Sequence, residues 1–133
     1  MDGPARAGPR AALPNPTPSG LFDAMVRQWT EEYQTVGFAG GCPVAAATVG
    51  CAESAASTRE AASDAFAAWN RAVAQALVGM GVPEGRSEAL AALMISALEG
   101  AILIARAERD TRALTTVSRE LGPVLDAATG KAH

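Results

Sequence analysis

The sequence predicts an all-α fold, and its composition supplies two of the three observations that support it. Of the 133 residues, 31 are Ala, the residue with the highest intrinsic helix propensity. Aromatic residues make up 5% of the chain and β-branched residues are scarce, so an all-β fold is nearly excluded. The length allows one domain with a core of its own and is short for two.

The third observation is that apolar residues recur at helical spacing, which predicts a bundle of about five helices. The first helix is expected over 20–36, with Ser19 as its N-cap and glycines after its end. Its apolar stripe is formed by Leu21, Phe22, Met25, Val26, Trp29 and Tyr33. Residues 1–18 hold five of the eight prolines and are expected to form a disordered tail.

Two further helices are expected in the middle of the chain. A short one should begin at Pro43, because proline suits the first turn of a helix, and the small apolar residues 44–52 indicate that protein surrounds it. The next should begin at Ser57, which forms a capping-box pattern with Glu60. Its stripe is Ala62, Phe66, Trp69, Val73, Leu77 and Met80.

The fourth helix is expected over 84–109, and its segment 89–105 has three interpretations. Only Ser96, Glu99 and Gly100 interrupt its apolar residues. A membrane span is disfavoured, because 17 residues fall short of the roughly 20 required and a central Glu is costly in lipid. The other two are the core helix of a monomer and a helix buried on both sides, by its own domain and by a second subunit.

We favour burial on both sides, because the small residues of this segment let helix axes approach closely. A fifth helix is expected from Asp110 or Thr111, with a kink or break at Gly122-Pro123. Two helices from each subunit would form an isologous four-helix interface. Its predicted residues are Ala97, Gly100, Ala101, Ile104, Leu114, Val117 and Leu121.

Charge and cysteine content limit the function classes. The net charge is −3, whereas a DNA-binding module of this size is normally basic. One His, His133, and two Cys form no recognisable zinc site, so neither a metal nor a cofactor is expected. Cys42 and Cys51 would lie roughly 12–13 Å apart on a helix, too far for a disulfide. Cys51 is expected to be a small buried side chain, and a redox-sensor role for Cys42 near a helix N-terminus is the weaker alternative.

The expected division is a tail over 1–18, a helical domain over 19–128 and a loose end over 129–133. No apolar leader precedes the first helix, so the cytoplasm is the expected compartment.

Three parts of the sequence resemble one known family. They are Gly41-Cys42-Pro43-Val44-Ala45-Ala46, the pair Phe66 and Trp69, and Ala97-Leu98-Glu99-Gly100-Ala101 followed by Ala105-Arg106-Ala107-Glu108-Arg109-Asp110. Together they resemble the C-terminal domain of TetR-type transcriptional repressors, in the LmrA/YxaF-like branch. The resemblance extends from about Leu21 to Leu125.

The resemblance implies a domain that binds a small hydrophobic effector and forms a homodimer through its last two helices. In such repressors an N-terminal helix-turn-helix domain binds DNA, and effector binding releases it. Nothing before Leu21 resembles that domain. We therefore expect a truncated form, a fragment or a natural protein without a DNA-binding domain, which would contact DNA only through a domain absent here.

The ligand pocket of such a domain would lie among the first four helices. Large apolar side chains line adaptable pockets, although plain core packing is the alternative for each. The candidates are Met25, Trp29, Tyr33, Phe66, Trp69, Val73, Met94 and Glu99. Glu99 would bind a cationic ligand or a ligand donor, or else bond a core group or lie across the dimer axis. Asn70 would supply an amide to the pocket or lie exposed.

Three function classes follow. The first is a ligand-sensing, dimerising domain of a repressor without catalysis. The alternative is an interaction protein without a DNA-binding domain, which dimerises with a full-length regulator and has no ligand of its own. An enzyme is the least supported, because the sequence offers no nucleophile–base pair and no glycine-rich phosphate loop.

Overall fold

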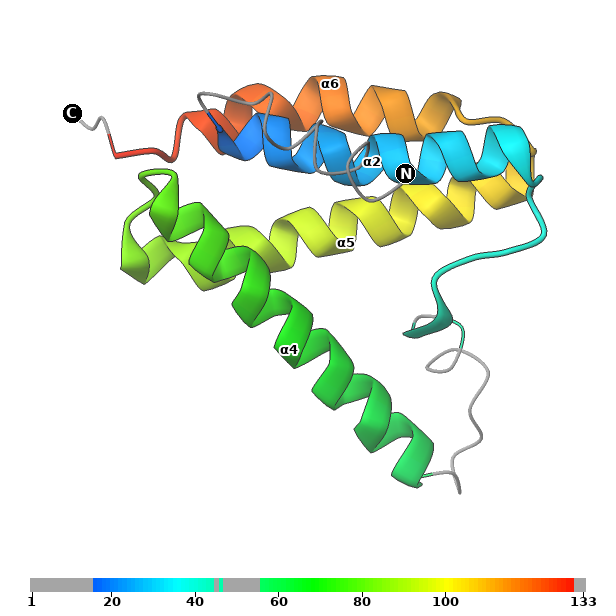
Figure 1. The fold of residues 1–133 in the computed structure, drawn as a ribbon, viewed down its shortest axis with the longest axis horizontal. Helices are drawn as coiled ribbons and strands as arrows, with labels where there is room; N and C mark the ends of the chain where they lie inside the picture. Colours follow the sequence, from blue (N-terminus) through cyan, green and yellow to red (C-terminus); the bar gives the residue numbers. More distant parts are fainter. Residues whose placement is uncertain (1–15, 45, 47–55, 131–133) are drawn as a thin grey trace, which may run out of the picture.

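The computed structural model describes residues 16–44, 46 and 56–130. Within these ranges it contains four helices with full bounds and no strand: α2 (Pro18–Thr35), α4 (Ala56–Gly79), α5 (Glu84–Glu108) and α6 (Arg112–Asp126) (Figure 1). Pro43, Val44 and Ala46 are also helical, where the short second helix was expected to begin. The rest of that helix, with Cys51, lies outside the described residues. The all-α prediction is confirmed.

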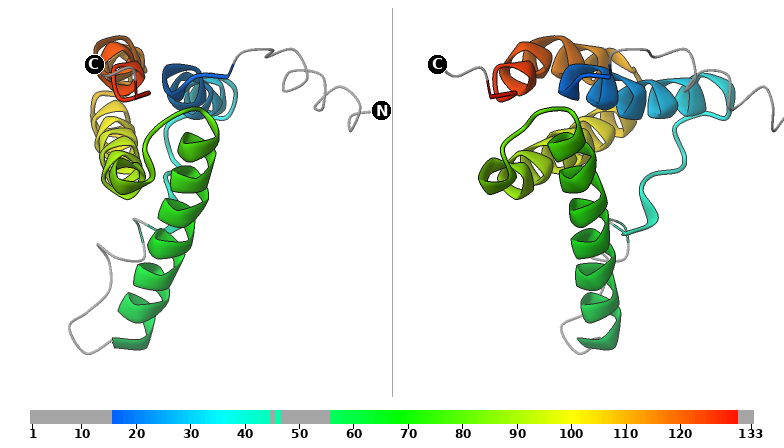
Figure 2. Two further views of the ribbon diagram at one scale, coloured as in Figure 1. Left: turned by 90° about the vertical axis from the view of Figure 1, so that its left-hand side faces the viewer. Right: turned by 60° about the vertical axis from the view of Figure 1, so that its left-hand side comes forward.

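Helices α2, α5 and α6 lie side by side, and α4 crosses one end of this group (Figures 1 and 2). α2 and α6 are antiparallel, since Ser19 contacts Asp126 and Asp23 contacts Ser118. α4 packs chiefly against α5, and its N-terminal half extends away from the other three helices. Gly81, at φ +103°, makes the turn that joins α4 to α5.

The core gathers apolar side chains from all four helices. The largest fully buried side chains include Phe22 of α2, Leu77 of α4, Met94 and Leu98 of α5, and Leu114 of α6. Because α5 contributes the most buried residues and contacts each of the other helices, it is the central helix of the domain.

The N-terminus of α2 differs from the prediction. Thr17, not Ser19, is the N-cap: its hydroxyl accepts from the backbone N–H of Gly20 at 3.1 Å. Pro18 occupies the first helical position, where its missing N–H costs nothing. Ser19 instead bonds across to α6, donating to the Asp126 carboxylate from its backbone N–H (2.9 Å) and its hydroxyl (2.7 Å). A carboxylate there also complements the helix dipole.

Two other boundary predictions were wrong. Helix α4 already includes Ala56, so Ser57 lies inside the helix rather than at its cap. The expected break at Gly122-Pro123 does not occur, since α6 continues to Asp126, whereas a kink there stays a prediction. Pro123 lies in the last turn, where its missing N–H removes a single bond. Gly122 is buried against α2, because a Cβ there would lie 3.3 Å from that of Ser19.

Helix α5 is apolar enough to cross a membrane by length and composition, as the core helix of a soluble protein also can be. Of the residues in its most apolar 18-residue window, 44% are buried inside the chain. The other residues of this window are partly buried or exposed in the single domain.

Candidate functional site

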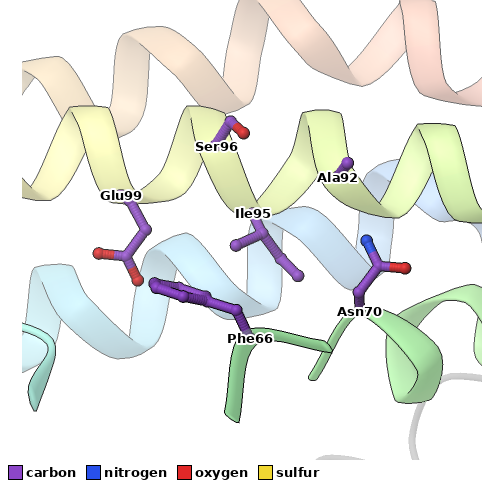
Figure 3. A pocket seen from close by; sticks show the side chains of 6 residues that line it. All are labelled: Phe66, Asn70, Ala92, Ile95, Ser96 and Glu99. Carbon is purple, nitrogen blue, oxygen red and sulfur yellow. The ribbon is translucent and has the colours of Figure 1, made fainter. Parts of the chain in front are cut away.

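A pocket of about 350 Å³ lies between α4 and α5 (Figure 3). Helix α4 lines it with Phe66 and Asn70, which are four residues apart. Helix α5 lines it with Ala92, Ile95, Ser96 and Glu99. These spacings of three and four residues place each set on one helical face. The volume lies at the lower end of the range for small-molecule sites, roughly 300–1,000 Å³.

The apolar wall of the pocket is partly aromatic. Phe66 stacks on Trp69, with the ring centroids 6.2 Å apart and an interplanar angle of 13°. Figure 3 shows the Phe66 ring extending from α4 toward α5, close to Ile95 and Glu99. Trp69 is only partly buried. It contacts the Phe66 ring but does not line the pocket itself.

Glu99 is the unusual side chain of this site. Both of its carboxylate oxygens are hidden from solvent, and neither has a hydrogen-bond partner among the residues that the structure describes. Burying a carboxylate without a partner is costly, so such groups are normally paired. Arg106, two turns further along α5, does not pair with it. Its guanidinium instead donates to the backbone carbonyls of Phe38 (3.3 Å) and Ala39 (3.0 Å).

Asn70 lies at the opposite end of the lining from Glu99 (Figure 3). Its amide nitrogen donates to the backbone carbonyl of Glu88 at 3.3 Å. This bond uses one of the two amide N–H groups and leaves the other N–H and the amide oxygen available to a ligand. Ser96 adds an exposed hydroxyl. The pocket therefore presents mainly hydrogen-bond acceptors.

The remaining predicted ligand residues lie elsewhere. Val73 and Met94 are buried in the core, and Met25 and Trp29 are partly buried on α2. Tyr33 is buried between Trp29 and Phe38 and donates to the Gly40 carbonyl at 3.0 Å. Burial of the phenol raises the pKa of Tyr33.

Of the eight candidates, the structure thus brings only Phe66 and Glu99 into this pocket, joined by Asn70. The prediction omitted Ala92, Ile95 and Ser96. Their positions seven, four and three residues before Glu99 were the available signal, because these spacings share one face of a helix.

The segment that follows α2 is fixed onto α5. A Cβ on Gly41 would lie 2.9 Å from the Arg106 guanidinium, so a larger residue at this position would displace that side chain. The guanidinium of Arg109 lies 5.9 Å from the centre of the Phe38 ring, a cation–π geometry. These contacts occupy the two basic side chains near the C-terminal end of α5. Cys42, next along the chain, is buried.

The predicted interface residues fall into two groups. Ala101 and Leu114 are 1% and 0% exposed within the single chain, so their side chains belong to its own core. Ala97, Gly100, Ile104, Val117 and Leu121 are partly buried or exposed. A Cβ on Gly100 would meet nothing within 4 Å.

The members that are not fully buried belong to two longer rows, to which the prediction had not assigned Leu93 and Val124. On α5, Leu93 precedes Ala97, Gly100 and Ile104 at steps of four, three and four residues. On α6, Val124 follows Val117 and Leu121 at steps of four and three. Leu93, Ile104 and Val124 are 42%, 49% and 54% exposed, which is high for large apolar side chains. We call these seven residues the apolar rows.

No group of three or more His, Cys, Asp or Glu side chains suited to a metal ion occurs among the residues that the structure describes.

Comparisons with known proteins agree with the resemblance noted in the sequence. Residues 18–120 match the family described as "Transcriptional regulator LmrA/YxaF-like, C-terminal domain". The chain is 35% identical over 122 residues to two uncharacterised HTH-type transcriptional regulators of Mycobacterium tuberculosis, from strains CDC 1551 / Oshkosh and ATCC 25618 / H37Rv.

These alignments cover 86% of this chain and 63% of each relative, so the chain spans less than two thirds of their length. No solved structure matches the chain significantly. The family match begins at the first residue of α2, includes α4 and α5, and ends within α6. The chain therefore belongs to the LmrA/YxaF-like family of TetR-type transcriptional regulators and carries their C-terminal domain.

Proposed function

We propose that this domain binds a small organic effector between α4 and α5 and forms a homodimer through α5 and α6. In a full-length regulator, effector binding would control DNA release by an attached helix-turn-helix domain. The domain would act in the cytoplasm and without catalysis. A single observation carries the proposal: α5 contributes four residues to the pocket and four to the apolar rows.

Because α5 contributes to both the pocket and the apolar rows, effector binding can affect the packing of two subunits. Ser96 and Glu99 line the pocket, whereas their neighbours Ala97 and Gly100 belong to the apolar rows. A ligand that shifts α4 against α5, or rotates α5, would therefore change how two subunits pack. A ligand acts in this way only if it binds the two arrangements with different affinity.

The pocket is tested by filling it. We expect the neutral dye N-phenyl-1-naphthylamine to become fluorescent on binding the wild-type domain. Ala92→Trp should abolish the signal, because Ala92 lines the pocket. Ala89→Trp is the matched control, since Ala89 is exposed on the same helix and is absent from the lining. Equal dye binding by wild type and Ala92→Trp would refute this site.

A second candidate function depends on the apolar rows alone. The domain would then dimerise with a full-length regulator, without a ligand of its own, and would reduce DNA binding by the mixed dimer. Co-purification of a tagged full-length regulator with this domain would support that function. Failure to recover mixed dimers after co-expression would refute it.

A further inference from the structure

We propose that the pocket between α4 and α5 selects cationic organic molecules, with an apolar body and a protonated nitrogen that donates to Glu99. The inference rests on the proposed function, because it assigns a chemical class to the effector of the same pocket. Its starting point is the unpartnered Glu99 carboxylate.

The charge of the lining is the first argument. Glu99 is the one ionisable side chain among the six lining residues, and no Lys or Arg is present to balance it. The nearby Arg106 is held by two backbone carbonyls and by its contact with Gly41. A carboxylate that is hidden from water and unpaired is stabilised most by a cation brought into the same site. An anionic ligand would instead be repelled.

The direction of the hydrogen bonds is the second argument. Both Glu99 oxygens are acceptors without a donor, and Asn70 has its amide nitrogen engaged by Glu88. A ligand group that contacts Glu99 must therefore supply N–H or O–H donors. A primary or secondary ammonium group supplies donors and positive charge together, and charge-assisted hydrogen bonds are the stronger kind.

The apolar wall defines the rest of the ligand. Phe66, Ile95 and Ala92 offer one aromatic and two aliphatic surfaces. The Phe66 ring lies beside the Glu99 carboxylate, so an ammonium group bound there would also face an aromatic ring (Figure 3). A volume of about 350 Å³ suits a body of about two fused rings.

Three probes with the same body test the charge preference: 2-naphthylmethylamine, 2-naphthylmethanol and 2-naphthoate, which are cationic, neutral and anionic at pH 7. Isothermal titration calorimetry on the full chain measures their affinities. We expect the amine to bind about 10- to 100-fold more tightly than the alcohol, as one charged hydrogen bond provides. The naphthoate should bind most weakly.

Glu99→Gln tests the residue, because it keeps the shape and removes the charge. We expect it to lower the amine-to-alcohol preference to about one. Glu108→Gln makes the same change at an exposed position of α5 and should keep the preference. Thermal unfolding followed by circular dichroism establishes that both variants are folded.

Ser96→Lys is a second variant, for use if Glu99→Gln does not fold. Position 96 is exposed and lies three residues before Glu99, so a lysine there can pair with the carboxylate. We expect it to lower the amine-to-alcohol preference toward one, because a paired Glu99 carboxylate attracts the ammonium group less.

The outcomes separate the two proposals. Equal binding of amine and alcohol by the wild-type domain would overturn cation selectivity and leave the pocket intact. A preference that survives Glu99→Gln would overturn the role of Glu99. Absence of binding by all three probes would overturn the inference, and the neutral-dye assay with Ala92→Trp then decides separately whether the pocket binds a ligand.

Discussion

At the scale of a single residue, Glu99 is unfavourable for the stability of the fold but suited to ligand binding. A domain selected only for stability would place an apolar or paired side chain at this position, since the carboxylate oxygens are buried and lack partners. Binding sites commonly retain such unfavourable groups, because the ligand compensates for them. Replacing Glu99 should therefore change the stability of the domain even when no ligand is bound.

Glu99→Gln should raise the free energy of unfolding of the unliganded domain by about 1 kcal/mol, because a neutral amide costs less to bury without partners than a charged carboxylate does. Urea denaturation monitored by circular dichroism measures it, and Glu108→Gln should leave stability nearly unchanged. A loss of stability in Glu99→Gln would contradict the prediction, since it would mean that the carboxylate has a stabilising partner.

Residue types in the sequence predicted the chemistry of this position but not its surroundings. Glu99 stood out because it is a charge within an apolar helix, and Phe66 because it is one of few aromatic residues. Met25, Trp29 and Tyr33 have equally suitable side chains and lie outside the pocket, on α2. Side-chain chemistry does not specify which helices lie next to each other.

At the scale of the elements, polar contacts fix α2 against α6. Asp23 accepts hydrogen bonds from Arg27 on its own helix and from the Ser118 hydroxyl of α6, the latter at 2.9 Å. The hydrogen bond from Arg27 is the largest influence and lowers the pKa of Asp23 from its usual 3.8, with a further contribution from Ser118. Because the pKa is lower in the folded chain, ionised Asp23 stabilises the fold at pH values above 3.8.

This contribution should be lost as the pH falls through the lowered pKa of Asp23. Asp23→Asn is therefore expected to destabilise the domain by a few tenths of a kcal/mol at pH 6 and to have little effect near pH 2. The effect is small because the Asp23 side chain is 44% exposed and its ion pair is screened by solvent. Urea unfolding of wild type and variant at both pH values measures it. A difference that persists unchanged at pH 2 would argue against an electrostatic origin.

The helix boundaries were predicted best where local signals were strong. The fourth helix was placed at 84–109 and occupies Glu84–Glu108, because Pro83 and the long apolar run define it locally. The errors at Ser19 and Gly122-Pro123 share a cause. Ser19 bonds to Asp126, and Gly122 packs against Ser19, so both depend on a helix about a hundred residues away in sequence.

At the scale of the whole molecule, the single domain leaves the apolar rows of α5 and α6 uncovered. Leu93 and Ile104 on one helix and Val124 on the other are each more than 40% exposed. A second copy of the domain would bury them, and closed dimers with two-fold symmetry are the commonest arrangement of such contacts. Gly100, in the middle of the α5 row, would then lie near the partner.

Gly100→Leu should convert the dimer into a monomer at micromolar concentration, because the larger side chain would collide with the partner. It should fold normally, since no other described part of the chain lies within 4 Å of a Cβ at this position. Sedimentation velocity measures the change. Gly85→Leu is the matched control, on the same helix with the same open surroundings, and should remain dimeric. A Gly100→Leu dimer of unchanged affinity would show that this row is not the interface.

The sequence by itself determined that the protein is helical, where its long helices lie and which family it belongs to. These properties depend on local preferences, on periodicity and on short motifs, which neighbouring residues in the chain supply. Only the tertiary structure decided which face of α5 meets α4 and which remains open. Because α5 is apolar nearly all round, the spacing of its apolar residues does not show which face of the helix is buried. The same sequence pattern therefore fits a core, a pocket or an interface. Packing against α4 and α6 divides that helix: Leu98 lies in the core, Glu99 in the pocket and Gly100 in the uncovered row.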